Sequence, residues 1–132
     1  RAPEIAARLR SDARAHMIPA MLARTLAADA GPAVVDLVTD MFNAASDAAI
    51  VALYELLDRY PPVIARAAAL RMPVLLVYGA ADPARPDPHT LPAALPIILI
   101  DGCSHVPPLE QPAAFNSVLE NFWRGLDLVA GQ

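Results

Sequence analysis

Two residues of this sequence combine suitable chemistry with suitable spacing for acid–base catalysis, Asp82 and His105. A carboxylate can orient an imidazole and stabilise its charged form, while the imidazole accepts a proton from a hydroxyl group. Asp82 follows the apolar run Pro73 to Tyr78, and His105 follows the apolar run Ile97 to Ile100. Continuous apolar runs of this length predict strands buried on both faces, as in parallel sheets. Because ligands bind beyond the carboxyl ends of parallel strands, both residues are candidates for one site.

The stretch from residue 72 to residue 112 resembles the C-terminal part of the α/β-hydrolases. In that family, Pro precedes an apolar strand that leads into G-x-x-D, often with another Pro four residues later. The next strand leads through a Gly-containing loop to the catalytic His, and P-x-x-E-x-P and a terminal helix follow. The residues that match this pattern here are Pro73 to Asp82, Pro86, Ile97 to His105, Pro107 to Pro112, and Phe115 to Trp123.

The resemblance implies that Asp82 is the acid and His105 the general base of a Ser-His-acid triad. It also implies hydrolysis of a carboxylic ester, a lactone or a similar small substrate, with no cofactor. Because the two loops lie at the same end of adjacent strands, a hydrogen bond between the two side chains is geometrically feasible.

The nucleophile of such a triad is missing from the sequence. No G-x-S-x-G motif occurs, and the nearest approximation, Gly102 to Val106, places Ser104 directly before the general base. A nucleophile elbow is a strand-to-helix turn earlier in the chain, so neither Ser104 nor Cys103 fits that role. We therefore expect the serine to lie on a segment outside this chain, and we expect the isolated chain to be inactive.

The first half of the sequence has the apolar periodicity of helices. Proline inside a helix removes a backbone hydrogen bond, and Ser or Asn favours a helix N-cap. The first expected helical stretch runs from residue 2 to about residue 30, with an end or kink near Pro19. The second helix is expected from Pro32 to about Asn43. The third is expected from Ala48 to Arg59, with Ser46 or Asn43 as its cap and Tyr60-Pro61-Pro62 as its break.

Residues 1–71 occupy the position at which α/β-hydrolases insert a helical cap, and residues 72–132 match the C-terminal part of their core. We therefore expect two segments with these bounds. Some large residues of the first segment could line a substrate pocket, although such residues at helical spacing are more often part of a core. These candidates are Met17, Met21, Met41, Phe42 and Tyr54.

The second segment contains a proline-rich bridge and a final helix. Prolines crowd residues 83–96, so no regular helix longer than one turn is expected there. The final helix is expected from about Gln111 to about Arg124, with Gly125 as its stop signal. Glu110 is expected to start or cap this helix.

Structural roles compete with catalytic ones for several polar residues. Asp82 stands directly before Pro83, so it could instead cap a helix. His16 and His89 have no motif around them and are expected to be solvent-exposed. Asp101 is expected to be a loop residue, although it could contribute a charge near His105.

Composition argues against several other classes of function. The 132 residues suit one domain, and the net charge of −4 provides no basic surface for nucleic acid. No apolar run is long enough to span a membrane, and no signal peptide opens the sequence. The single cysteine is compatible with a reducing cytoplasm, and one Cys with three His gives no metal-ligand spacing. Because the sequence begins with Arg1 rather than Met, we expect a processed chain or a piece of a longer protein.

We therefore predict an α/β fold with an incomplete sheet: a helical cap, then the last two parallel strands and the terminal helix of a hydrolase. Two such strands leave edges and a face uncovered. The chain is therefore expected to pack against a missing N-terminal half, to dimerise, or to be marginally folded. Two other classes stay open. One is a non-catalytic interaction module or pseudo-enzyme on this scaffold, and the other is an unrelated small α/β protein with an unrecognised nucleophile.

Overall fold

The computed structural model describes residues 2–10, 14–60, 63–93 and 95–130. By its internal contacts the chain forms two compact units. The first contains Arg1–Ala23 and Gly31–Pro61, and the second contains Arg24–Ala30 and Pro62–Gln132. Residues 24–30 thus leave the helical part of the chain for the unit that carries Asp82 and His105. The predicted division at residue 71 into a cap-like and a core segment stays a prediction.

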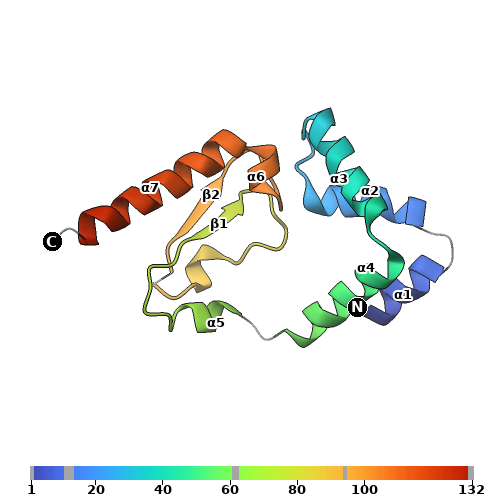
Figure 1. The fold of residues 1–132 in the computed structure, drawn as a ribbon, viewed down its shortest axis with the longest axis horizontal. Coiled ribbons are helices and arrows are strands. Elements are labelled where there is room, and N and C mark those ends of the chain that lie inside the picture. The colour runs from blue at the N-terminus through green and yellow to red at the C-terminus, as the bar shows by residue number, and fades with distance from the viewer. Residues whose placement is uncertain (1, 11–13, 61–62, 94, 131–132) are drawn as a thin grey trace. The chain divides into compact units, whose positions relative to one another are not determined.

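Helices make up the first unit (Figure 1): α1 (Ala2–Arg10), α2 (Arg14–Thr25), α3 (Pro32–Ala44) and α4 (Asp47–Arg59). α1 packs against α4, and the backbone N–H of Ala2 donates a hydrogen bond to Asp58 Oδ2 at 3.0 Å. The Ser46 hydroxyl oxygen accepts a hydrogen bond from the Ala49 N–H at 3.2 Å. The sequence predictions for α3, α4 and the Ser46 cap are therefore confirmed.

Of the end or kink predicted near Pro19, the end is wrong, because α2 continues through Pro19 to Thr25, and the kink stays a prediction. Pro19 is exposed, so water can bind the carbonyl group that loses its helical partner. The single helix predicted from residue 2 to about residue 30 is instead represented by α1 and α2. Residues 11–13 between them lie outside the described residues, as do Pro61 and Pro62, the predicted break after α4.

The second unit is built on two parallel strands, β1 (Leu76–Gly79) and β2 (Ile97–Ile100). Leu76 lies opposite Ile97 and Gly79 opposite Ile100, so the two strands end at the same level. β1 begins later than the predicted Pro73, because its partner strand begins only after Pro96. The other elements of the unit are α5 (Val63–Ala67), the short 3-10 helix η1 (Pro88–Thr90), α6 (Pro107–Glu110) and α7 (Pro112–Ala130).

Both strands are less buried than their apolar sequences predict. Ile98 and Leu99 of β2 are 38% and 37% exposed, whereas Ile100 at the end of the strand is buried. A sheet of two strands has two edges and cannot cover both of its faces, so part of the apolar surface stays open. The predicted incomplete sheet is therefore confirmed.

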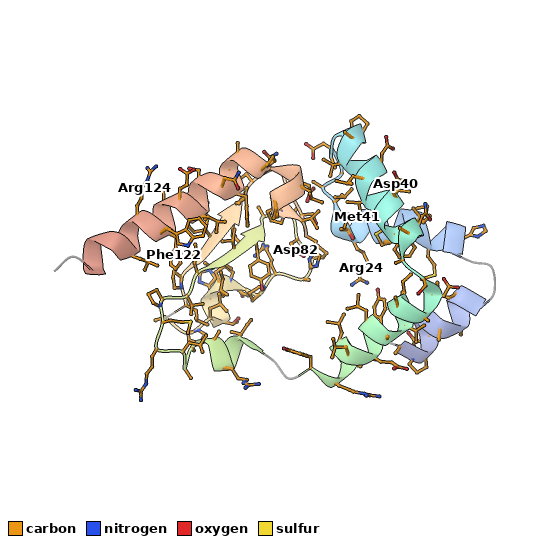
Figure 2. All side chains as sticks on the ribbon, viewed as in Figure 1. Arg24, Asp40, Met41, Asp82, Phe122 and Arg124 are labelled. Atoms are coloured by element: carbon orange, nitrogen blue, oxygen red, sulfur yellow. The ribbon has the colours of Figure 1, made fainter. Side chains whose placement is uncertain are left out.

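The terminal helix α7 runs to Ala130, past the predicted stop at Gly125. Gly125 has no positive φ, and outside its chain neighbours and the adjacent backbone of its own helix no atom lies within 4 Å of the position that its Cβ would take. A glycine in a helix costs about 1 kcal/mol relative to alanine, which a long amphipathic helix can sustain. Figure 2 shows Phe122 on the side of α7 toward the strands, whereas Arg124 points away and pairs with Glu120 at 3.4 Å.

The predicted fold class is confirmed: helices precede two parallel strands and a terminal helix in an α/β arrangement. Among the described residues of the proline-rich bridge, η1 is the only helical element, as predicted. Within the described ranges, no helix is both long and apolar enough to cross a membrane.

Candidate active site

Asp82 and His105 meet just beyond the carboxyl ends of the two strands. Asp82 Oδ2 and His105 Nδ1 are 2.9 Å apart, so the hydrogen bond that we expected between the two side chains is present. The Asp82 side chain is 2% exposed and the His105 side chain 55% exposed. A buried carboxylate therefore holds an imidazole whose other side is open to solvent.

The loop after β1 fixes the carboxylate of Asp82 through its backbone. The Ala84 N–H donates to Asp82 Oδ1 at 2.7 Å, and the Asp82 N–H donates to the Gly79 carbonyl oxygen at 3.1 Å. The Arg85 Nε–H closes the same turn by donating to the Ala80 carbonyl oxygen at 3.1 Å. Asp82 therefore stabilises a turn rather than capping a helix, and this interaction uses only its Oδ1. The second oxygen remains available for His105.

Close approach of the two loops requires a residue without a side chain at Gly79. A Cβ on Gly79 would overlap the carbonyl oxygen of Ser104 and would lie 2.5 Å from the carbonyl oxygen of Cys103. With no side chain at Gly79, the two loops lie close enough for the Ala81 N–H to donate to the Cys103 carbonyl oxygen at 3.1 Å. The glycine of the G-x-x-D pattern therefore lets the loop after β2 lie directly on the end of β1.

The loop after β2 carries His105 and is held at several points. Gly102 has a φ of +68°, in the left-handed region that favours glycine, and its carbonyl oxygen accepts a hydrogen bond from Gln111 Nε2 at 3.1 Å. The His105 N–H donates to the Thr25 carbonyl oxygen at 2.9 Å. The last residue of α2 thus supports the His loop, a long-range contact for which the sequence pattern has no signal.

Glu110 does not have its predicted role at the start of α7. It ends the short helix α6, and its two carboxylate oxygens bind two distant backbone groups. Oε1 accepts from the Ala27 N–H at 2.6 Å, and Oε2 accepts from the Ser104 N–H at 2.9 Å. The prediction was wrong because a carboxylate near a helix start resembles a cap in sequence, whereas these donors lie elsewhere in the chain.

The geometry of the pair suits proton transfer at one defined atom. A carboxylate accepts hydrogen bonds only, so the bond to Asp82 places the ring proton of neutral His105 on Nδ1. The opposite atom, Nε2, then has a lone pair. None of the hydrogen bonds within the described part of the chain involves Nε2. Nε2 can therefore accept a proton from a hydroxyl group placed beside it.

Neighbouring nucleophilic side chains are buried in the loop rather than directed at His105. Cys103 is fully buried, and its Sγ–H donates to the Ile100 carbonyl oxygen at 3.2 Å. Burial raises the pKa of the Cys103 thiol, and the negative charges of Glu110 and Asp101 raise it further. The Ser104 hydroxyl is also buried and donates to the Ala81 carbonyl oxygen at 3.5 Å. A raised pKa disfavours the reactive thiolate, in agreement with the exclusion of Cys103 as a nucleophile.

Within the described part of the chain, the other candidate polar residues form no hydrogen bond to Asp82 or His105. His16 and His89 are exposed, as predicted, and Asp101 is an exposed loop residue. Within the described residues, no group of three or more His, Cys, Asp or Glu side chains could hold a metal ion. The cavities found on the first unit lie along α1 and α4, and none of the five predicted pocket residues lines them. The pocket role of those residues stays a prediction.

Comparison with known proteins relates the fold, but not the sequence, to an esterase. No protein-family model matches the sequence, and no curated protein matches it significantly. Among solved structures, the chain is similar to a thermophilic esterase from Thermogutta terrifontis, determined with malate bound. The TM-score is 0.78 and the sequence identity 21%, over 92% of this chain and 48% of the esterase chain. The chain therefore has a hydrolase-like fold and spans about half the length of that esterase.

Proposed function

We propose that this chain is the C-terminal part of an α/β-hydrolase and supplies the acid and the base for hydrolysis of a small carboxylic ester or lactone. The observation that carries the proposal is the 2.9 Å hydrogen bond between buried Asp82 and exposed His105, at the carboxyl ends of parallel strands. The similarity of the fold to half of an esterase supports the same reaction class. Residues 1–71 serve as the cap in this proposal, and residues 72–132 belong to the catalytic core.

In the proposed reaction, Nε2 of His105 takes the proton of a serine hydroxyl as its oxygen attacks the substrate carbonyl. Asp82 stabilises the imidazolium that forms and keeps the ring in the reactive tautomer. The imidazolium then returns the proton to the leaving alcohol. Water, activated by the same ring, subsequently hydrolyses the acyl-serine and releases the acid. No cofactor takes part in these steps.

The serine comes from a segment outside the 132 residues in this proposal. Ser104, the serine next to His105 in sequence, is buried, and its hydroxyl donates a hydrogen bond to the Ala81 carbonyl oxygen, which supports this assignment. The partly exposed Ile98 and Leu99 on β2 support a neighbouring segment that covers the open sheet. In this proposal that segment is the N-terminal half of the same hydrolase, which also carries the serine. Alternatively, a second copy of the chain covers the sheet without supplying the serine. With one buried cysteine and no need for a disulfide, we place the protein in the cytoplasm.

A non-catalytic interaction module is the second candidate. The half-exposed apolar side chains of β2 favour it, because they could bind a partner without any chemistry at His105. Under this alternative, a His105→Ala variant would retain both its partner and its biological effect.

Ester hydrolysis by the native protein, meaning this chain with any segment or partner that accompanies it in its source, separates the two candidates. We expect turnover of p-nitrophenyl acetate, and a loss on the order of 10⁴-fold or more in kcat for His105→Ala. His89→Ala is the matched control, because His89 is exposed on η1 and lies outside the pair. Equal activity of the wild type and His105→Ala would overturn the proposed function.

A further inference from the structure

We propose that Glu110 is a positioning residue that holds His105 in reach of Asp82. The expected effect of Glu110 on catalysis rests on the proposed function, whereas its effect on the geometry of the Asp82–His105 pair does not. Within the described part of the chain, no hydrogen bond joins Glu110 to Asp82 or to the imidazole of His105. Glu110 acts through the backbone N–H groups of Ser104 and Ala27.

The carboxylate of Glu110 joins two segments that are far apart in the chain. Oε2 binds the N–H of Ser104, the residue directly before His105, at 2.9 Å. Oε1 binds the N–H of Ala27 at 2.6 Å. The same two segments are joined again where the His105 N–H donates to the Thr25 carbonyl oxygen at 2.9 Å. Three hydrogen bonds therefore join the His loop, the Glu110 side chain and residues 25–27, and two of them end on the Glu110 carboxylate.

The position of His105 depends on its backbone to an unusual degree. More than half of the His105 side chain is exposed, so little packing holds the ring, and its side-chain hydrogen bond is the one to Asp82. Asp82, by contrast, is buried and held by its own turn. A shift of the His loop would therefore move Nδ1 relative to a fixed carboxylate. Hydrogen bonds to a charged acceptor are shorter and stronger than neutral ones, so a carboxylate is well suited to prevent such a shift.

The test compares Glu110→Gln with Glu120→Gln in the native protein. Glu120 is a suitable control because it is exposed on α7 and pairs only with Arg124 in the described contacts. We expect Glu110→Gln to shift the NMR signals of the Ala27 and Ser104 amides and of His105 Nδ1. We also expect it to lower kcat for p-nitrophenyl acetate by on the order of 10²-fold with little change in KM, because small displacements of a catalytic group have effects of that size. Glu120→Gln should change none of these.

Failure of this inference differs from failure of the proposed function. If the two amide signals shift while the His105 ring signal and kcat stay unchanged, Glu110 has only a structural role and the inference is overturned. If the ring signal shifts but the wild-type protein hydrolyses no ester, the positioning role stands and the proposed function is overturned.

Hydrogen exchange in the wild-type protein tests the inference where Glu110→Gln does not fold. The amides of Ala27, Ser104 and His105 are expected to exchange together, because the carboxylate and the Thr25 contact close one connected unit. Exchange of the Ala27 and Ser104 amides far faster than that of His105 would show that Glu110 does not hold the loop, which overturns the inference.

Discussion

Gly79 lies directly beneath the backbone of Ser104, so closely that a Cβ at position 79 would overlap the Ser104 carbonyl oxygen. This contact brings the loop after β2 onto the end of β1, and it thereby brings His105 to Asp82. The geometry of the Asp82–His105 pair consequently depends on the absence of a side chain at position 79.

Gly79→Ala is therefore expected to destabilise the fold. The added Cβ meets backbone atoms rather than a flexible side chain, so we expect a loss of about 1–3 kcal/mol in the free energy of unfolding. Gly125→Ala is the matched control, because its Cβ meets nothing within 4 Å in a helix, and it should stabilise by about 0.5–1 kcal/mol. Denaturant unfolding of both variants measures these opposite signs. An unchanged stability for Gly79→Ala would mean that the loops are not in contact.

Asp82→Asn tests the proposed role of Asp82 as the triad acid, with minimal change in the shape of the side chain. The amide can still accept the Ala84 N–H, but it cannot stabilise an imidazolium as a carboxylate does. We expect kcat of the native protein for p-nitrophenyl acetate to fall on the order of 10⁴-fold. Asp87→Asn, at the exposed cap of η1, offers the same substitution outside the pair and should leave kcat unchanged. Equal losses for the two variants would contradict the assigned role of Asp82.

The buried thiol makes stability fall at alkaline pH. The pKa of Cys103 is raised above its ordinary value of 9.0, first by burial and then by the charges of Glu110 and Asp101. The thiol of the unfolded chain therefore ionises at a pH at which the folded thiol is still protonated. This contribution to stability is complete below pH 9.0 and decreases as the pH rises through the folded pKa.

Thermal melting across this pH range measures the effect. We expect the melting temperature to fall more steeply with pH in the wild type than in Cys103→Ala, because the variant lacks the thiol. We also expect iodoacetamide to react with Cys103 only as the chain unfolds, since the side chain is fully buried. Rapid alkylation of the folded protein, or equal slopes for both proteins, would contradict the environment described for Cys103.

The isolated 132-residue chain is expected to hydrolyse no ester and to self-associate. Its two-stranded sheet leaves Ile98 and Leu99 partly exposed, and open strand edges favour pairing with another chain. Sedimentation velocity should show association that Leu99→Lys reduces, because charge on an exposed strand opposes pairing. Ala113→Lys, which adds the same charge at an exposed position of α7, should reduce it less. A monodisperse monomer with a cooperative melt would contradict the expected need for a partner.

The sequence predicted the local parts of this structure well. The apolar runs indicated both strands, the prolines excluded a long helix between them, and Ser46 marked the start of α4. Each of these signals depends on residues that are neighbours in the chain. α2 does not end at Pro19, nor does α7 end at Gly125, although Pro and Gly cost about 3 and about 1 kcal/mol in a helix interior, because the other residues of each helix outweigh that cost.

The contacts that position the candidate site could not be predicted in the same way. Glu110 binds Ala27 across 83 positions of sequence, and nothing in the pattern around either residue indicates the other. The close contact of Gly79 with Ser104 likewise exists only once the two strands are paired in register. The motifs predicted that Asp82 and His105 lie close together, whereas the groups that hold them in place are determined by the tertiary fold.

The most direct test of the central claim is the identity of the residue labelled by a serine-reactive fluorophosphonate probe in the native protein. If Asp82 and His105 serve a serine from another segment, mass spectrometry will find the label on a serine outside the 132 residues, within G-x-S-x-G. Labelling will then be much slower in His105→Ala. A label on Ser11, Ser46, Ser104 or Ser117, or a labelling rate unaffected by His105→Ala, would contradict the proposed triad.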